Sequence, residues 1–336
     1  MKKLTKTLTA LLGAAIITAW VLFSAETKTS VYNAIILCAE SVIPSLFPTL
    51  FVVLLLINSG CAALVPKKAA PIFLFITSMV SGYPVGAKLL SSMVKQEQLS
   101  KESAVKILPT MICAGPAFII NIIGSGIFSD IRLGIRLYLC QLFANFLIFI
   151  VCGGTKIEIN RFISNEKAIN VFTNSVRQSV DSIINICAYV VLFSALSSIV
   201  TKISGSTFSK YFLYLFEVTG GVYNSNNIFI TCAVISWSGI CVIFQVLSAA
   251  DNIHISIIRL ITVRIISAVL SCAVLKISFI LFRHSNPVIS NISSEPPSAI
   301  LSDNIVFAAV FFFSLFVLLF SLSIRSTGKF LRDITG

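Results

Sequence analysis

Charged side chains are scarce in this chain, and their scarcity excludes an ordinary soluble protein. Only 11% of the 336 residues are Asp, Glu, Lys or Arg, whereas 57% are apolar, and a soluble domain carries about 25% charged residues. The mean hydropathy is +0.97. A soluble fold of this length could not hide so much apolar surface, because growing cores split into domains with solvated faces. The composition predicts a protein that uses lipid as its solvent.

Residues arranged for catalysis or metal binding are equally scarce. The two histidines, His254 and His284, lie at the ends of apolar runs without an acidic or cysteine partner at metal-binding spacing. The nine cysteines form no CxxC pair, and in an apolar helix Cys behaves as a small hydrophobic residue. Ser92 and Lys95 match the SxxK pattern of serine nucleophiles, but they lie on a charged connector without the other elements of such a site. We therefore expect no enzyme, no metal and no cofactor.

The chain is strongly basic, with a formal net charge of +12. Its basic residues lie mainly at the edges of apolar runs, as the positive-inside rule describes, so nucleic acid is not an expected partner. Lys2, Lys3 and Lys6 precede an apolar run, which raises the question of a secretory signal. Because Phe23-Ser24-Ala25 matches a cleavage site poorly, residues 1–30 are interpreted as an uncleaved anchor helix with a cytoplasmic N-terminus.

Apolar runs long enough to cross a bilayer recur along the chain. About 20 apolar residues span a membrane as a helix, and backbone groups in hydrocarbon must be paired within the segment. The sequence predicts an all-α, polytopic protein of about 8–10 helices. The candidate runs are 7–25, 33–60, 71–93, 107–129, 133–152, 179–200, 227–250, 255–282 and 304–324; the run 208–222 is too short to span with certainty. A simple count of spans places the basic segment 153–178 outside the cell, against the positive-inside rule. If 71–93 is a re-entrant hairpin that enters and leaves on one side, this segment lies inside, but the basic C-terminal end then conflicts with the same rule.

The chain also divides into two weakly similar halves. In each half a Ser-rich apolar helix (41–60 and 182–205) precedes an apolar run interrupted by Ser-Gly (73–92 and 229–249). Interrupted segments at corresponding positions of two halves are typical of transporters. The predicted organisation is an anchor (1–30), a first repeat (31–152), a polar connector (153–178), a second repeat (179–283), a flexible linker (284–303) and a C-terminal helix with a basic tail (304–336).

Helix-breaking residues inside apolar runs are the candidate functional positions. Ser81-Gly82-Tyr83-Pro84 leads into Gly86 and Lys88, and Pro and Gly should unwind the helix there. Freed backbone groups at membrane depth must face protein or a water-filled cavity. The alternative is that Gly82 and Gly86 form a packing seam while Lys88 extends toward the interface.

Three further segments repeat this pattern. Gly115-Pro116 is followed by Asn121, Glu217 stands before Gly220-Gly221, and Gln245 follows the Ser-Gly pair of the last interrupted run. For Asn121 the alternative is a hydrogen bond across a kinked packing helix. Ionisable residues inside membrane segments are costly and usually face the interior. Of these, Glu217 and Arg259 are the predicted interior residues; Arg264, five positions after Arg259, lies on a different helix face.

The four segments SGYPVGAKLL, AGPAFIINIIGSGIF, LFEVTGG and SGICVIFQVLSA together resemble the YlbJ family of sporulation integral membrane proteins. That family belongs to the wider group with a nucleoside-recognition, or Gate, domain, and the resemblance covers about residues 35–280. It implies an endospore-forming bacterium, a cell-membrane location and a role in forming the spore cortex. The family's polar motifs fall on eleven substrate-binding candidates: Ser81, Gly82, Pro84, Gly86, Lys88, Gly115, Pro116, Asn121, Glu217, Gly220 and Gln245.

Two functions remain open at this point. The first is a transporter for a small polar solute, nucleoside-like or a cell-wall precursor, with the lipid bilayer as its surroundings and a homo-oligomer left open. The second is a scaffold that does not transport and recruits cortex-building partners.

Overall fold

The computed structural model describes residues 2–61, 65–66, 69–160, 167–204, 206–225 and 227–281. Within these ranges the regular structure is helical, apart from one isolated β-bridge between Leu99 and Ile159. Five helices are long and apolar enough to cross a membrane: Ser24–Asn58, Ile131–Val151, Ala168–Ile203, Ile228–Ala249 and Ile257–Leu281. This confirms the predicted all-α membrane fold. The predicted linker 284–303 and C-terminal helix 304–336 lie outside the described residues.

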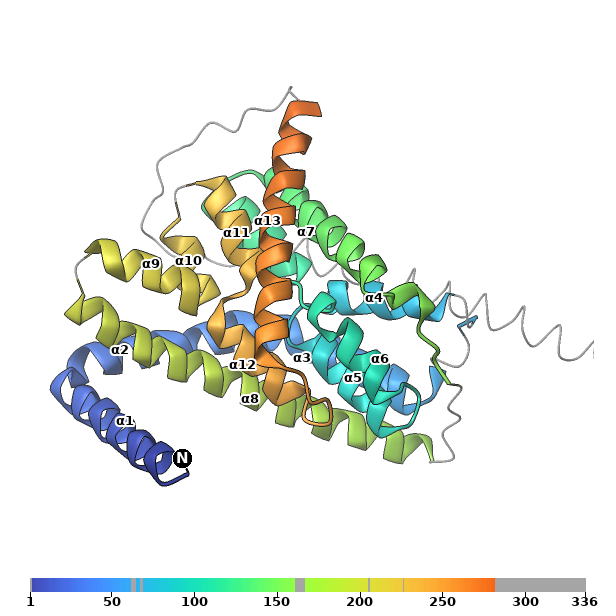
Figure 1. Cartoon of the computed structure of the whole chain (residues 1–336), viewed down its shortest axis with the longest axis horizontal. Coiled ribbons are helices and arrows are strands. Elements are labelled where there is room, and N and C mark those ends of the chain that lie inside the picture. Colours follow the sequence, from blue (N-terminus) through green and yellow to red (C-terminus); the bar gives the residue numbers. More distant parts are fainter. Residues whose placement is uncertain are drawn as a thin grey trace, which may run out of the picture.

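The N-terminal region consists of a projecting helix followed by a much longer one. Helix α1 (Lys2–Leu22) ends just before Phe23 and points away from the other helices (Figure 1). The next helix runs without interruption for 35 residues, through the segments α2 (Ser24–Leu37), η1 (Cys38–Val42) and α3 (Ile43–Asn58). At 1.5 Å per residue it is about 52 Å long, which exceeds the roughly 30 Å hydrocarbon layer. The boundary after α1 therefore falls near residue 23, seven positions before the predicted end of the anchor.

The rest of the first half is a series of shorter helices that ends in a continuous one. Its elements are α4 (Ala70–Ser81), α5 (Val85–Lys95), α6 (Lys101–Ile107), η3 (Leu108–Thr110), η4 (Ala117–Ile127), α7 (Ile131–Val151) and η5 (Gly154–Lys156). Asp130 starts α7 because its carboxylate accepts hydrogen bonds from the backbone N–H groups of Arg132 and Leu133. The segment η4 is a π-helix, a form that is often found at functional sites.

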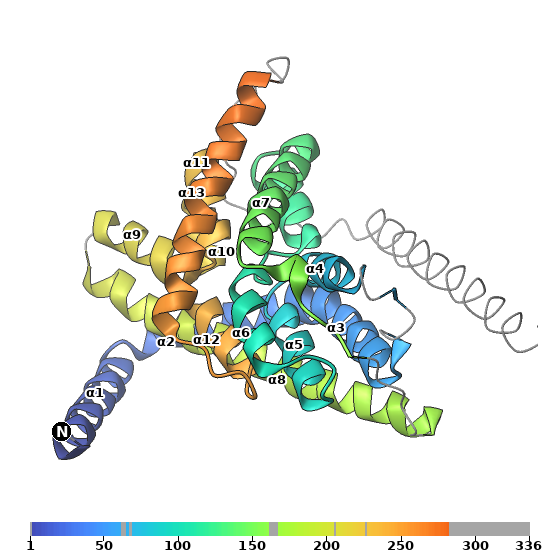
Figure 2. The same ribbon diagram turned by 45° about the vertical axis from the view of Figure 1, so that its right-hand side comes forward.

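The second half begins with a 36-residue helix, α8 (Ala168–Ile203). Helix α8 starts inside the predicted polar connector 153–178, so the last part of that connector is helical. The remaining elements are α9 (Ser206–Phe216), α10 (Val218–Tyr223), α11 (Ile228–Trp237), α12 (Gly239–Ala249) and α13 (Ile257–Leu281). Figure 2 shows α13 and α7 rising steeply beside each other above α8.

Each half contains one helical hairpin. A Cβ atom added to Gly86 would lie 3.1 Å from the Cβ of Ser78, although residues eight apart in a straight helix are separated by about 12 Å. The chain therefore reverses between α4 and α5, as the re-entrant interpretation of 71–93 predicts. In the same way, a Cβ atom on Gly221 would lie 3.2 Å from the carbonyl oxygen of Leu213. The short run 208–222 is thus a hairpin made of α9 and α10.

The order of elements pairs the halves differently from the sequence comparison. Each half has a long helix, a hairpin, an interrupted helix and a continuous helix. The counterpart of the first hairpin is α9–α10, so the predicted match of 73–92 with 229–249 is wrong by one element. Ser-Gly occurs both at 81–82 and at 238–239, because each of these helix interruptions needs a glycine with a positive φ. This common feature made two different elements look equivalent in the sequence.

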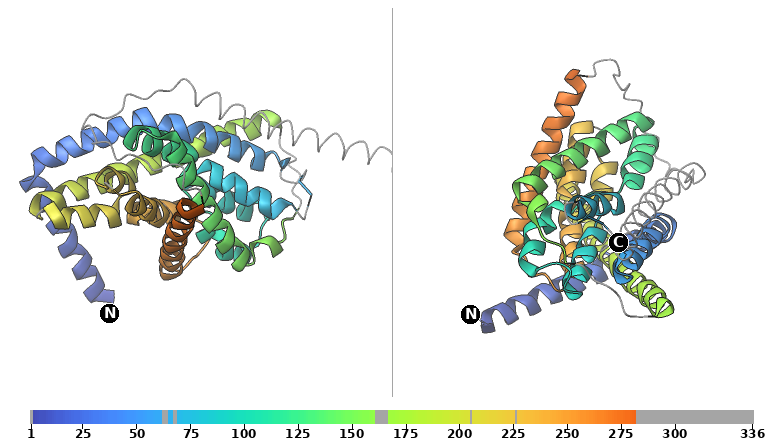
Figure 3. Two further views of the ribbon diagram at one scale, coloured as in Figure 1. Left: turned by 90° about the horizontal axis from the view of Figure 1, so that it is seen from above. Right: turned by 90° about the vertical axis from the view of Figure 1, so that its right-hand side faces the viewer.

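Equivalent helices of the two halves run in opposite directions. Along the long helices, Ser30 contacts Ser194 and Asn58 contacts Ser175, so one sequence ascends where the other descends (Figure 3). Helices α7 and α13 behave in the same way, because Asn145 contacts Arg264 while Arg136 lies over the ring of Phe279. Antiparallel pairing of equivalent elements is what an inverted repeat produces.

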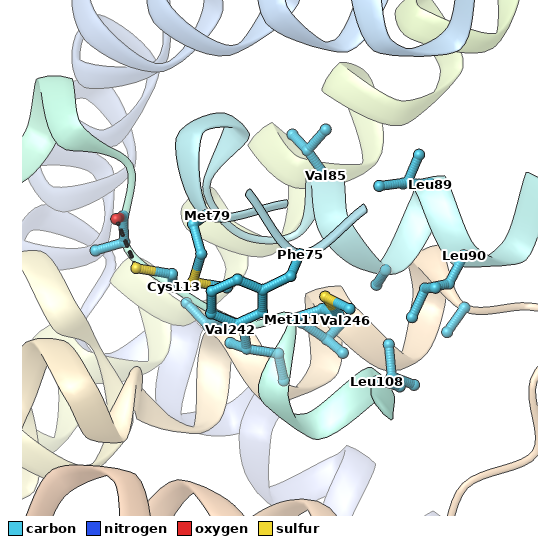
Figure 4. Packing of buried hydrophobic residues seen from close by; sticks show 14 of the residues in the cluster. Phe75, Met79, Val85, Leu89, Leu90, Leu108, Met111, Cys113, Val242 and Val246 are labelled. Carbon is cyan, nitrogen blue, oxygen red and sulfur yellow. Dashed lines mark hydrogen bonds between the residues drawn. The ribbon is translucent and has the colours of Figure 1, made fainter. Parts of the chain in front are cut away.

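The interior between the halves is filled by close-packed apolar side chains. Figure 4 shows this cluster, to which α4, α5, the segment after α6 and α12 all contribute: Phe75, Met79, Val85, Leu89, Leu90, Leu108, Met111, Cys113, Val242 and Val246. On the outside, α7 and α13 expose large apolar residues such as Leu139 and Val269. Apolar side chains inside and outside are expected of a helix bundle in lipid.

The substitution Gly86→Ala tests the hairpin packing. A Cβ atom on Gly86 would lie 2.5 Å from the carbonyl oxygen of Met111, so backbone would have to move. We expect the free energy of unfolding to fall by about 1–3 kcal/mol, as overpacked cores show, measured by thermal unfolding of the purified protein in detergent. Gly115→Ala is the control, because its Cβ atom would meet only the Cα of Gly82, at 3.8 Å. Equal stability of the two variants would contradict the observed packing.

Candidate functional site

Four interruptions of the helices lie in the interior, two in each half. In the first half they are the hairpin turn at Gly82–Pro84 and the non-helical segment Met111–Gly115. In the second half they are the hairpin turn at Glu217 and the kink at Ser238, where φ is +73°. Backbone polar groups that a helix would pair internally are released at each of these points. Which atoms pair with these released N–H and C=O groups determines whether the region can bind a ligand.

The two interruptions of the first half are joined through their backbones. The N–H of Tyr83 donates a hydrogen bond of 2.7 Å to the carbonyl oxygen of Cys113. Gly82 has a φ of +75°, and a Cβ atom there would lie only 2.9 Å from the backbone nitrogen of Gly115. Glycine is required at position 82 by both its φ and this close approach.

The two interruptions of the second half meet in an equivalent way. Gly239 has a φ of +71°, and a Cβ atom there would lie 3.1 Å from the carbonyl oxygen of Phe216 and 3.4 Å from the backbone nitrogen of Glu217. The indole N–H of Trp237 donates a hydrogen bond of 3.0 Å to the carbonyl oxygen of Leu215. In both halves, therefore, a glycine brings the hairpin turn against the interrupted helix.

Arg264 on α13 connects the two halves. Its side chain is 0% exposed, and its Nη1 donates to the carbonyl oxygen of Ile112 at 2.7 Å and, more weakly, to that of Pro109 at 3.5 Å. Its Nη2 donates to the carbonyl oxygen of Ser236 and to Oγ of Ser238, the latter at 3.3 Å. One guanidinium therefore pairs carbonyl groups released by the interrupted helices of both halves. We call Arg264 and these four acceptor residues the arginine junction.

Polar residues of α7 and α13 support the junction. Oδ1 of Asn145 accepts hydrogen bonds from Arg264 Nη1 at 3.3 Å and from Ser267 Oγ at 2.8 Å. Nδ2 of Asn145 donates to the carbonyl oxygen of Ile112 at 3.2 Å, and Nε2 of Gln141 donates to that of Ile235 at 3.0 Å. The carbonyl oxygens of the interrupted helices are thus paired with side chains from the two continuous helices.

The charge of Arg264 has no carboxylate partner in the part of the chain that the structure describes, where the ion pair found is Lys202 with Glu26. A planar guanidinium suits this position because its fixed fork can donate in two directions at once. Three buried polar atoms at or beside the junction have no hydrogen-bond partner among the described residues: Nε of Arg264, Oε1 of Gln141 and Oγ of Ser236. Buried polar groups are normally hydrogen-bonded, so the junction has unused bonding capacity.

A small polar cavity lies beside the first hairpin, between the two halves. Its walls come from α3, the turn and first residues of α5, α8 and α12, and its polar lining consists of Lys88, Ser182, Asn185, Tyr189, Gln245 and Ser248. The volume is about 30 Å³, which is enough for water. Lys88 is half-buried and is the charged residue of the lining.

The structure divides the eleven predicted site residues into four groups. Pro84, Lys88 and Gln245 line the cavity. Five candidates lie in the first-half interruptions or at the helix ends beside them: Ser81, Gly82, Gly86, Gly115 and Pro116. Glu217 and Gly220 lie at the second hairpin turn. Asn121 lies apart from these residues on η4 and does not line the cavity.

Glu217 acts as a helix cap in this structure. Its Oε1 accepts a hydrogen bond from the N–H of Thr219 at 3.0 Å, and its Oε2 accepts one from that of Gly220 at 2.6 Å. A Cβ atom on Gly220 would lie 2.5 Å from Oε2, so the glycine leaves space for the carboxylate. Lys88 and Glu217 form no ion pair with each other, although both lie in the described part of the chain.

The central arginine was not singled out by the sequence. Arg259, predicted to be interior, is exposed, whereas Arg264 is buried. A usable signal was present, because Leu260, Arg264, Ser267 and Ser271 recur every three or four residues and are all buried. This spacing places them on one face of α13.

No protein-family model, curated protein or solved structure matches this chain.

The variant Arg264→Met tests the junction. It leaves the carbonyl oxygens of Ile112 and Ser236 without their charged donor, and we expect the free energy of unfolding to fall by about 3 kcal/mol or more, since hydrogen bonds to charged groups are strong. Arg264→Lys should recover only part of this loss, because an ammonium lacks the planar fork. Thermal unfolding in detergent gives the comparison, with the exposed Arg259→Gln as control. Unchanged stability of Arg264→Met would refute the role assigned to the guanidinium.

The variant Glu217→Ala tests the cap of α10. Removing an N-cap side chain lowers stability by about 0.5–2 kcal/mol, and Glu217→Asp should retain most of it because Asp also caps helices. The measurement is again the unfolding temperature of the purified protein. Glu40→Ala, which removes an exposed acidic residue of the long helix, should have little effect. A loss of stability in Glu217→Asp as large as that in Glu217→Ala would argue against capping.

Proposed function

We propose that this protein is a membrane transporter that moves a small polar solute between its two halves. The observation that carries the proposal is the arrangement of the four helix interruptions: the arginine junction joins the interrupted helices of the two halves, and each hairpin turn packs against the interrupted helix of its own half. Inverted repeats whose interrupted helices converge on a central polar region are the architecture of many secondary transporters. Non-helical backbone at membrane depth is tolerated only where it lines a water-filled cavity or is hydrogen-bonded to other parts of the protein.

The solute site in this proposal is the cavity beside the first hairpin. Its residues come from both halves, as a site at a repeat interface requires: Pro84 and Lys88 from the first, Gln245 and residues of α8 from the second. A volume of about 30 Å³ is far below the roughly 300 Å³ at which ligand pockets begin. In this proposal the structure is the closed state, and solute binding requires the hairpin to move away from α8 and α12.

The proposed cellular setting rests on the sequence resemblance alone. The likeness to the YlbJ family of sporulation proteins supports a role in an endospore-forming bacterium, in the cell membrane during formation of the spore cortex. In that setting the solute is nucleoside-like or a cell-wall precursor. The unused polar atoms beside Arg264 support transport, since a junction that opens needs groups able to bind water or solute.

The second candidate is a scaffold that recruits cortex-building partners and does not transport. One observation favours it: Arg264 fills the junction, and the cavity beside the first hairpin has space for little more than water. A protein that never opens would have the same dry, tightly packed centre.

Solute flux distinguishes these functions. The purified full-length chain is reconstituted in proteoliposomes, and uptake of labelled nucleosides and soluble cell-wall precursors is compared with protein-free vesicles. For a transported solute we expect Lys88→Ala to reduce uptake about tenfold or more, because it removes a charged contact. Lys95→Gln, on the same helix but exposed, should retain wild-type uptake.

Three outcomes decide the matter. Uptake above the vesicle background that depends on Lys88 supports the proposal. Wild-type uptake in Lys88→Ala removes this cavity from the solute path. Background uptake of every solute by the wild-type protein favours the scaffold.

A further inference from the structure

The chemistry of the cavity beside the first hairpin restricts the solute that it can accept. Its lining contains one cation, Lys88, and no acidic side chain; the other polar members are hydroxyl and amide groups. Lys88 forms no ion pair within the described residues. An ammonium group at a cavity without a carboxylate partner is available to form a charge-assisted hydrogen bond with an anionic ligand.

The position of Lys88 on its helix adds to the positive potential. Lys88 is the fourth residue of α5, which begins at Val85. The N-terminus of a helix carries a partial positive charge, so a basic residue in the first turn is disfavoured and an anion nearby is favoured. The N-terminus of α5 and the ammonium group of Lys88 therefore both favour an anionic ligand.

The residues around Lys88 supply hydrogen-bond donors from the opposite half. Tyr189 on α8 and Gln245 on α12 line the same cavity, whereas the hydroxyl of Ser182 already donates to the carbonyl oxygen of Gln178. Gln245 is 6% exposed, and its Nε2 has only a thiol contact, 3.3 Å from Sγ of Cys241. Hydroxyl and amide donors combined with a cation are suited to the oxygen atoms of a phosphate or carboxylate.

From this juxtaposition we infer that the solute is an anion, which places its phosphate or carboxylate group against Lys88. The inference rests on the proposed function and narrows its substrate class. Neutral nucleosides and neutral sugars bind weakly in this cavity, whereas their phosphorylated forms bind well. The anion bridges Lys88 of the first half to donors of the second half, so binding is coupled to the relative position of the halves.

One residue offers a structural alternative. Asp181 precedes Ser182 on α8 and is exposed, so a shift of α8 could bring its carboxylate to Lys88 and satisfy the ammonium without a solute. In the structure the two residues form no ion pair. Asp181→Asn therefore serves as the matched control for charge changes at this site.

Matched pairs of neutral and anionic probes test the inference. Uridine is compared with uridine 5′-monophosphate, and N-acetylglucosamine with its 1-phosphate, together with inorganic phosphate, at constant ionic strength. The full-length protein is held in phosphatidylcholine nanodiscs, and ligand-induced increases in unfolding temperature give apparent affinities. We expect at least one anionic member to bind on the order of tenfold or more tightly than its neutral partner, and Lys88→Gln to remove that difference. Lys88→Arg should retain the preference, and Asp181→Asn should not change it.

The outcomes separate failure of this inference from failure of the proposed function. Equal binding of neutral and anionic members, unaffected by Lys88→Gln, overturns the anionic substrate and leaves transport standing. Binding by no probe, together with background uptake in proteoliposomes, overturns both. A parallel series replaces part of the phosphatidylcholine with phosphatidylglycerol. Stabilisation that depends on Lys88 but arises only from the anionic lipid identifies a lipid headgroup in the cavity and overturns the soluble anion.

Discussion

The buried cation of Arg264 joins the interrupted helices of the two halves. The interrupted helices release carbonyl groups in a region without bulk water, and such groups must be paired to be tolerated. Arg264 pairs carbonyl oxygens from both halves at once, and Asn145 pairs one of the same carbonyl oxygens while bonding Arg264 itself. The interruptions and the arginine depend on each other. Without the carbonyl groups the buried charge would be unstable, and without the charge the carbonyl groups would be unpaired.

The inverted arrangement explains why this centre lies between the halves. The long helices α2–α3 and α8 cross on one side, while α7 and α13 pair on the other side (Figure 3). Each hairpin packs against the interrupted helix of its own half through a glycine, Gly82 in one and Gly239 in the other. The halves are therefore internally rigid where their own interruptions meet. Between them, the halves pack through the paired long helices, the pair α7–α13 and the apolar interior, and the hydrogen bonds of Arg264 join their interrupted helices.

The sequence predicted the parts of the fold that follow from local hydrophobicity. The runs 133–152 and 255–282 correspond to Ile131–Val151 and Ile257–Leu281, because a span needs only enough apolar residues. The reversal at Gly82–Pro84 was also predictable, since proline and glycine break helices locally. The burial of Arg264 could have been predicted from the spacing of Leu260, Arg264, Ser267 and Ser271. Its partners could not, because they are mainly backbone carbonyl groups of residues more than 25 positions away, and residue types do not reveal which carbonyl groups are unpaired. The cap formed by Glu217 is local, since its carboxylate accepts from the N–H groups two and three residues later, and it stands beside the prediction that Glu217 belongs to a solute site.

The central claim is that the two halves meet at Arg264. An experimental density map of the full-length protein in a lipid nanodisc, determined by electron cryomicroscopy, tests this most directly. The account predicts a guanidinium buried between the halves, within hydrogen-bonding distance of the carbonyl oxygens of Ile112 and Ser236. A map in which Arg264 faces lipid, or is paired with a carboxylate while the four interruptions lie apart, would contradict it.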